Sequence, residues 1–274
     1  MSKGSFTAEI SYRRDATKDL FVLGLDLGEN RKDFNFKAGQ YCTIGLLDAQ
    51  NNVILDRERK KAWRPYSIVS APGEYEIELF VELVPPEHGG NLTPLLYGRH
   101  IGDTVEVLPK PKGALLFESE FKNQVMVSTV TGLAPFMSMI REYFEGLKRD
   151  MLMDHSFYVL QGASYHNEFV YDAELRRLGC AWHKLARTLG NGLEFDYVPT
   201  VSRPNEPENF SWEGEKGRVN AIVEEYLEGA GLEPEDTVVY VCGHPGMIED
   251  VKERLAPRGW SLKLKNLKEE RFWK

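Results

Sequence analysis

The chain has 274 residues, a formal net charge of −8 and three cysteines. Domains commonly hold roughly 100–200 residues, so this length predicts two of them. The acidic balance argues against a nucleic-acid partner, and no two cysteines have the C-x-x-C spacing of a zinc or iron–sulfur site. The beginning of the chain lacks a signal-peptide pattern, and no apolar run approaches the roughly 20 residues of a membrane span. A cytoplasmic protein with reduced thiols is therefore expected.

Short β-rich runs separated by turn residues occupy the chain up to about residue 117. Residues 76–84 are the clearest run, because polar and apolar side chains alternate along them as on a half-buried strand. A short helix is expected near Leu92–Tyr97. Closely spaced short strands predict a sandwich or a barrel. The expected strands are Phe6–Arg13, Leu20–Leu27, Tyr41–Leu47, Tyr66–Val69, Tyr75–Val84 and Asp103–Leu108.

Strands and helices alternate after Phe117, which predicts a doubly wound parallel sheet. The expected strands are Gln124–Ser128, Ser156–Gln161, Glu194–Pro199, Val238–Cys242 and one near Ser261–Leu267. The expected helices are Phe136–Lys148, Tyr171–Gly179, Arg218–Glu228 and Gly246–Pro257. We place the two domains at residues 1–119 and 120–274.

Two motifs in the first half suit a dinucleotide. The run Arg64-Pro65-Tyr66-Ser67 offers a planar cation for a pyrophosphate, an aromatic ring for stacking and a hydroxyl donor. The run 90–94, Gly-Asn-Leu-Thr-Pro, opens the short helix, where backbone N–H groups attract anions. The alternatives are a tyrosine in the core beside a surface arginine, and a simple threonine helix cap.

Three further motifs lie in the second half. Residues 129–136 join a strand to a helix at the sheet edge where ligands bind, although they are not a G-x-G-x-x-G fingerprint. Cys242 ends a later strand and is either a nicotinamide contact or an inert buried thiol. Ser202, Arg203 and Arg218 suit a ribose 2′-phosphate, although a lone arginine is commonly a surface ion-pair partner. The chain ends on two aromatic residues that either pack on a core or cover a flat ligand.

Taken in order, these motifs resemble the ferredoxin–NADP reductase family, and within it the bacterial flavodoxin/ferredoxin branch. The resemblance covers nearly the whole chain. It implies an N-terminal antiparallel β-barrel that binds FAD and a C-terminal α/β domain that binds NADP. The motifs are R-P-Y-S at 64–67, G-N-L-T at 90–93, T-x-T-G-L-A-P-F at 129–136, T-V-S-R at 200–203, V-C-G-H-P-G-M at 241–247 and E-R-F-W at 270–273.

The resemblance also implies residue roles. Ser67, Cys242 and Glu270 would lie at the reacting centre, and no metal is implied. The FAD contacts would be Arg64, Pro65, Tyr66, Ser67, Phe80, Gly90, Asn91, Leu92, Thr93, Thr131, Phe272 and Trp273. The NADP contacts would be Thr131, Gly132, Ser164, Ser202, Arg203, Arg218, Cys242 and Gly243.

Three departures from the family pattern stand out. Val130 occupies a position where relatives often have glycine, so a differently shaped phosphate turn is expected. Ser164 stands where bacterial relatives often carry arginine, which leaves two arginines at the 2′-phosphate and weakens the preference for NADP over NAD. The stretch Cys180–Asn191 reads as extra helix and loop without an assigned function.

The implied activity is hydride exchange between NADPH and flavin N5, coupled to one-electron transfer with ferredoxin or flavodoxin. A monomer is expected, and an acidic carrier would be steered by the basic loop between Asp56 and Arg64, whose five basic and two acidic residues give +3. The steering candidates are Arg57, Arg59, Lys60 and Lys61. The alternatives are an NADH-dependent reductase component of an oxygenase or another multicomponent system, and a non-catalytic electron-transfer subunit.

Overall fold

The computed structural model describes residues 4–48, 50, 52–55, 61–149 and 152–271. The chain forms two compact units, of which unit 1 comprises Met1–Leu116 with Ala134–Glu145, and unit 2 comprises Phe117–Leu133 with Gly146–Lys274. The units are not continuous in the sequence, because the first helix after residue 120 packs with unit 1. The division of the sequence at residues 119 and 120 therefore stays a prediction.

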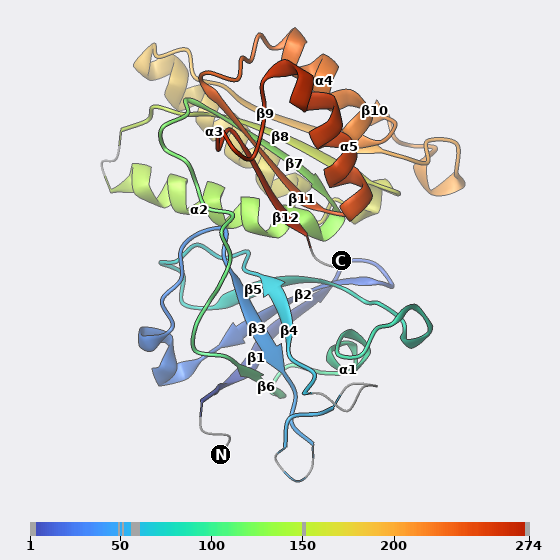
Figure 1. Cartoon of the computed structure of the whole chain (residues 1–274). Coiled ribbons are helices and arrows are strands. Elements are labelled where there is room, and N and C mark those ends of the chain that lie inside the picture. Colours follow the sequence, from blue (N-terminus) through green and yellow to red (C-terminus); the bar gives the residue numbers. More distant parts are fainter. Residues whose placement is uncertain (1–3, 49, 51, 56–60, 150–151, 272–274) are drawn as a thin grey trace. The chain divides into compact units, whose positions relative to one another are not determined.

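Unit 1 contains one antiparallel sheet with the strand order β4-β3-β6-β1-β2-β5 (Figure 1). An antiparallel bridge between Ile68 and Leu79, beside a hydrogen bond from the Val69 N–H to the Glu78 carbonyl at 2.9 Å, joins the two ends of this order. The sheet therefore closes on itself, which confirms the predicted antiparallel β-barrel. Its strands are β1 (Phe6–Asp15), β2 (Leu20–Asp26), β3 (Tyr41–Gly45), β4 (Arg64–Ser67), β5 (Ile77–Glu82) and β6 (Thr104–Val107).

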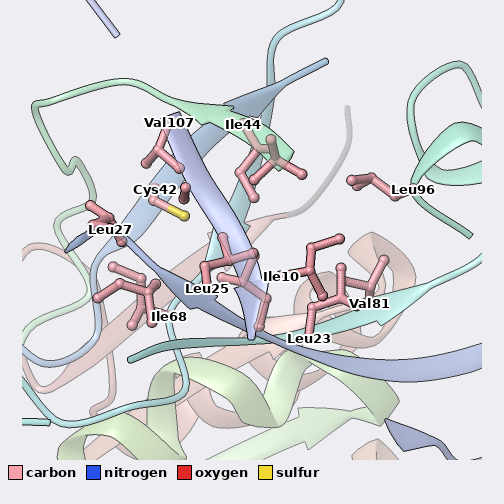
Figure 2. Packing of buried hydrophobic residues seen from close by; sticks show 14 of the residues in the cluster. Ile10, Leu23, Leu25, Leu27, Cys42, Ile44, Ile68, Val81, Leu96 and Val107 are labelled. Atoms are coloured by element: carbon pink, nitrogen blue, oxygen red, sulfur yellow. The ribbon is translucent and has the colours of Figure 1, made fainter. Parts of the chain in front are cut away.

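The core of the barrel is built by alternate residues of its strands. On β5, Leu79 and Val81 lie in the core cluster, whereas the residues between and beside them face the other way. Figure 2 shows side chains from several strands, among them Ile10, Leu25 and Ile44, packed together with the thiol of Cys42. Each fully buried aliphatic side chain contributes about 1.5–3 kcal/mol, so this interior fixes where the strand ends lie.

Helix α2 (Ala134–Lys148) is attached to unit 1 by polar contacts. Ser138 Oγ donates to the Ser70 carbonyl at 2.7 Å, and Arg141 lies 3.2 Å from Glu78 and 3.8 Å from Glu74. Glu78 also accepts a hydrogen bond from the Tyr12 hydroxyl. The barrel and the helix thus share one polar network.

Unit 2 contains a parallel sheet with the strand order β10-β9-β8-β7-β11-β12. Alternate residues of β8 point to opposite faces of the sheet: Leu160 packs with α4 and α5, whereas Phe157 packs on Trp182 of α3 at 5.4 Å between ring centroids. Figure 1 shows these helices beside the sheet. Helices on both faces confirm the predicted doubly wound sheet. The elements are β7 (Asn123–Thr129), β8 (Ser156–Ala163), α3 (Asp172–Leu189), β9 (Phe195–Val201), β10 (Glu215–Lys216), α4 (Val219–Gly229), β11 (Thr237–Gly243), α5 (Pro245–Leu255) and β12 (Leu267–Arg271).

Helix α3 is longer than its predicted range of Tyr171–Gly179. Gly179 lies within the helix and does not end it. An added Cβ there would meet the Phe195 ring at 3.1 Å, so this glycine allows the helix to pack closely on β9. The helix runs on to Leu189 and ends at Gly190, which has a left-handed φ of 63°. Most of the stretch Cys180–Asn191 is therefore the second half of α3.

The prediction of a final strand near Ser261–Leu267 is wrong, because the last strand, β12, begins at Leu267. The Asn266 side chain accepts from the Ser261 N–H at 2.9 Å and donates to the Gly259 carbonyl at 3.0 Å. These bonds fold the segment into turns, and its leucines at 262 and 264 are exposed. The described helices include none long and apolar enough to cross a membrane.

Candidate functional site

The first group of predicted site residues lies on β4, which pairs with β3 in antiparallel register. Tyr66 is opposite Cys42, and Ser67 is opposite Tyr41. The Tyr66 ring packs partly on the barrel core, and its hydroxyl is buried without a hydrogen-bond partner in the described part of the chain. Burial raises the pKa of Tyr66, so the hydroxyl remains a neutral donor. The strand therefore combines a core tyrosine with an unsatisfied polar atom, which suits a polar ligand group.

The other predicted residues near this strand differ in exposure. Arg64 is half-buried, and its Nη1 donates to the Trp63 carbonyl at 2.9 Å. Ser67 is buried, and so is Phe80, which lies on β5 facing away from Leu79. Proline at position 65 is exposed and supplies no N–H to the strand.

The segment before α1 (Thr93–Tyr97) is held tightly against the residues after β5. A Cβ on Gly90 would lie less than 3.0 Å from the Val84 carbonyl, so only glycine fits there. Thr93 Oγ1 accepts from the Val84 N–H at 3.1 Å and donates to its carbonyl at 3.2 Å. Leu92 is the N-cap residue and is buried, so the simple threonine cap is wrong. The hydroxyl of Thr93 thus fixes the loop, and Asn91 lies half-buried beside it.

In unit 2, the turn Val130–Leu133 follows β7 and closes against the end of β11. A Cβ on Gly132 would lie less than 3.0 Å from the backbone carbonyl of Cys242. Val130 has a φ of 42°, the left-handed conformation that glycine adopts freely and a β-branched residue rarely does. The valine therefore keeps a glycine-type backbone at this turn. Its side chain packs on a cluster that includes Phe169 and Val201.

The end of β11 is joined to the end of β7 by backbone contacts. Gly243 has a φ of 126°, and a Cβ there would lie less than 3.0 Å from Thr129 Oγ1. The same hydroxyl oxygen accepts from the His244 N–H at 2.9 Å. His244 Nδ1 accepts from the Gly246 N–H at 3.0 Å, so the His244 side chain caps α5.

Cys242 lies in a row of polar residues that crosses the sheet in register. Ser128 of β7 and Glu270 of β12 are its two neighbours, and Gln161 of β8 is next to Ser128. Burial, and then the charge of Glu270, raises the pKa of the Cys242 thiol, so the thiol stays protonated. Such a thiol is a small apolar contact and not a nucleophile.

The sequence reasoning missed Ser128 and Gln161. Both are fully buried, and Ser128 Oγ and Gln161 Nε2 have no hydrogen-bond partner among the described residues. The other side of the amide is satisfied, because Gln161 Oε1 accepts from the Tyr197 hydroxyl at 2.8 Å. A polar residue that directly follows a run of apolar residues toward the carboxyl end of a strand is the signal that marks both positions.

The loops after β8 and β9 are brought together by Asn209, which is also absent from the predicted site. Its Nδ2 donates to the Ser164 carbonyl at 2.8 Å and to the Arg203 carbonyl at 2.9 Å, and its Oδ1 accepts from the His166 N–H at 2.9 Å. Asn209 is buried. The structure therefore juxtaposes Ser164 and Arg203, two predicted contacts of the 2′-phosphate.

Two carboxylates lie beside these predicted contacts. Glu168 Oε2 accepts from the Ser164 N–H at 2.7 Å and from the Tyr165 N–H at 3.1 Å. Arg203 Nη1 donates to the Tyr165 hydroxyl at 2.9 Å and lies 3.6 Å from Glu206. The Tyr165 hydroxyl in turn donates to Glu206 at 2.6 Å, a bond that raises the pKa of Tyr165.

The remaining predicted residues of unit 2 are placed as follows. Arg218 is exposed at the N-cap of α4, and its guanidinium makes no hydrogen bond or ion pair with the described residues. The Ser202 N–H donates to the Ala163 carbonyl at 2.8 Å. Thr131 is buried in the turn Val130–Leu133. Five of the predicted residues lie outside the part of the chain that the structure describes: Arg57, Arg59, Lys60, Phe272 and Trp273.

Comparison with known proteins gives consistent matches. Residues 126–253 match the oxidoreductase NAD-binding domain. The chain is 24% identical to a flavodoxin/ferredoxin–NADP reductase of Buchnera aphidicola subsp. Schizaphis graminum over 94% of each chain. It is 29% identical to a ferredoxin–NADP reductase of Azotobacter vinelandii, over 84% of this chain and 81% of the relative.

A solved structure shares the fold across the whole chain. It is a ferredoxin NADP+ reductase from Neisseria gonorrhoeae with bound FAD and NADP, with a TM-score of 0.78 and 23% identity over 99% of this chain and 100% of that one. A closed antiparallel barrel and a parallel nucleotide-binding sheet define the two-domain class of oxidoreductase. Within this class, the chain is similar to ferredoxin–NADP reductases over most of its length, which bears out the resemblance drawn from its motifs.

Proposed function

We propose that the chain is an FAD-dependent flavodoxin/ferredoxin–NADP reductase. The observation that carries this proposal is the phosphate turn of unit 2, where Gly132 lies against the Cys242 carbonyl next to a protonated thiol. A turn at the carboxyl end of a parallel strand, with glycines that allow close backbone approach, is a dinucleotide site. A neutral thiol beside it lets a nicotinamide ring approach without a charge.

The residues of unit 1 fit FAD. The half-buried guanidinium of Arg64 offers planar donors for a pyrophosphate, and the buried Tyr66 hydroxyl lacks a partner among the described residues, so a polar ligand group would satisfy it. Gly90 keeps the loop before α1 close to Val84 and leaves its remaining backbone groups for an anion. Bound FAD would supply the flavin ring that exchanges a hydride with NADPH and passes electrons on singly.

The residues of unit 2 fit NADP(H). The turn around Thr131 and Gly132 would bind the pyrophosphate, and Ser202, Arg203 and Arg218 would bind the 2′-phosphate. Glu270, in register with Cys242, would orient the nicotinamide from the neighbouring strand. Ser67 would donate a hydrogen bond to the flavin from its buried position on β4. None of these residues acts as a covalent catalyst in this proposal.

Phe272 would cover the flavin and Trp273 would lie near the adenine of FAD, and displacement of Phe272 would admit the nicotinamide. The basic loop with Arg57, Arg59, Lys60 and Lys61 would steer an acidic ferredoxin or flavodoxin. A monomer in the cytoplasm, with domains at residues 1–119 and 120–274, completes the proposal. No metal takes part in it.

The test is purification of the full chain, release of its flavin for chromatography, and assay with NADPH. Bound FAD, ferricyanide reduction and one-electron reduction of a ferredoxin or flavodoxin are the expected results. A colourless chain that does not take up added FAD would overturn the proposal. Activity confined to NADH would point instead to the reductase component of a multicomponent system.

A further inference from the structure

We infer that Glu206 is a specificity-determining residue for the dinucleotide, because it competes with a ribose 2′-phosphate for Arg203 and accepts a ribose 2′-hydroxyl instead. This inference rests on the proposed function, and it names the residue that sets the ratio between NADPH and NADH. Glu206 lies in the loop after β9, three residues beyond Arg203.

The arginine expected to bind the 2′-phosphate is already engaged. Its guanidinium donates to the Tyr165 hydroxyl at 2.9 Å, lies 5.4 Å from the centre of the Tyr165 ring and lies 3.6 Å from the Glu206 carboxylate. Tyr165 donates its own proton to Glu206 at 2.6 Å. The three side chains form a closed triangle of contacts that needs no ligand.

The loops that carry the triangle are fixed by hydrogen bonds to their backbone. Buried Asn209 donates to the carbonyls of both Ser164 and Arg203, and the Glu206 N–H donates to the Arg203 carbonyl at 3.1 Å. Arg203 and Glu206 therefore keep their spacing through the backbone. A 2′-phosphate has to compete with Glu206 rather than displace a loosely attached side chain.

The two carboxylates of this region, Glu206 and Glu168, oppose the binding of a dianion. A phosphate monoester carries about −1.5 to −2 at neutral pH, whereas Arg203 is offset by Glu206 and the backbone N–H groups of Ser164 and Tyr165 are taken by Glu168. A ribose 2′-hydroxyl has a proton to donate, and an acidic residue is the group that binds it in dinucleotide sites. Glu206 therefore lowers the affinity for NADPH and favours NADH.

The closing experiment compares kcat/KM for NADPH and NADH in the holoenzyme with ferricyanide as acceptor. Glu206→Gln keeps an oxygen that accepts from Tyr165 and removes the charge. We expect the ratio of kcat/KM for NADPH to kcat/KM for NADH to rise about five- to tenfold, an order-of-magnitude estimate for one close charge. Glu208→Gln is the matched control, because Glu208 is exposed in the same loop, and its ratio should stay at the wild-type value.

A double-mutant cycle with Arg203→Ala separates competition from a general charge effect. Without Arg203, Glu206→Gln should change the ratio by less than half as much as it does in the wild-type background. Calorimetric titration with NADP+ and NAD+ gives the same comparison without turnover. An unchanged ratio for Glu206→Gln, or an equal change for Glu208→Gln, overturns the inference alone. Absence of binding by both nucleotides in the wild type overturns the proposed function together with it.

Discussion

Gly132 lies so close to the backbone carbonyl of Cys242 that an added Cβ would come within 3.0 Å of it. The contact joins the turn after β7 to the end of β11, the two segments proposed to hold the dinucleotide. Because the opposing atom belongs to the backbone, neither side moves cheaply.

Gly132→Ala is therefore expected to destabilise the protein by about 1–3 kcal/mol, the range of overpacked sites. The KM for NADPH should rise as well, while the FAD content stays unchanged. Thermal unfolding and steady-state kinetics measure both effects. Gly229→Ala is the control, since nothing lies within 4 Å of its Cβ position at the end of α4. Equal effects of the two alanines would refute the steric argument.

The buried thiol of Cys42 predicts a pH dependence of stability. Burial raises its pKa from 9.0 to about 12. The unfolded chain therefore loses this proton at a lower pH than the native barrel does, so the stabilisation is complete below pH 9 and is lost as the pH rises toward 12. Urea unfolding at several pH values above 9 should give a falling free energy of unfolding.

Cys42→Ala should make that decline shallower, at a cost of about 1 kcal/mol at neutral pH for the lost packing. Cys180→Ala, on the exposed side of α3, is the control and should leave the slope unchanged. If the slope for Cys42→Ala equals that of the wild type, the thiol is not the source of the pH dependence.

Asn209 predicts a link between loop structure and nucleotide binding. Asn209→Ala removes three hydrogen bonds, of which two tie the loop after β9 to the loop after β8 and one lies within the loop after β9. We expect a loss of about 1–3 kcal/mol in stability and a larger rise in the Kd for NADP+ than for FAD. Asn205→Ala, at an exposed position of the same loop, should change neither quantity. Identical behaviour of the two variants would show that Asn209 is dispensable.

The basic loop predicts an electrostatic contribution to carrier association. The variant replaces Arg57, Arg59, Lys60 and Lys61 by glutamate. The association rate with an acidic ferredoxin or flavodoxin should fall about tenfold or more at low salt, and its salt dependence should flatten. Stopped-flow measurements at several ionic strengths test this. Reversal of Lys184 and Arg187 on α3 is the control, and an unchanged salt dependence in the loop variant would eliminate the steering role.

Much of the fold follows from local patterns in the sequence. The alternation from residue 76 to 84 predicts a half-buried strand, and β5 occupies Ile77–Glu82. Proline at 135 predicts the beginning of α2, and it lies in the first turn of that helix. The position of the final strand does not follow from the local pattern. The side chain of Asn266 folds the preceding residues into turns through hydrogen bonds to Ser261 and Gly259, which no local pattern reveals.

The candidate site was predicted less completely, since its missed residues act over long separations. Asn209 binds a carbonyl 45 residues away at Ser164, and Tyr165 meets Glu206 across 41 residues. Such partners are set by the order of strands in the sheet. The exposed Arg203, by contrast, was found through its motif, although the carboxylate beside it was not.

The attachment of α2 to the barrel has a consequence for exchanging parts between related reductases. A fragment ending at residue 119 would lose the hydroxyl of Ser138 and the guanidinium of Arg141, which bind the backbone carbonyl of Ser70 and the carboxylate of Glu78. In a chimera that takes its nucleotide-binding half from a relative, the side chains of α2 that contact the barrel should therefore come from the same parent as the barrel. A recombination design should therefore keep α2 together with the barrel, although the helix follows residue 119 in the chain.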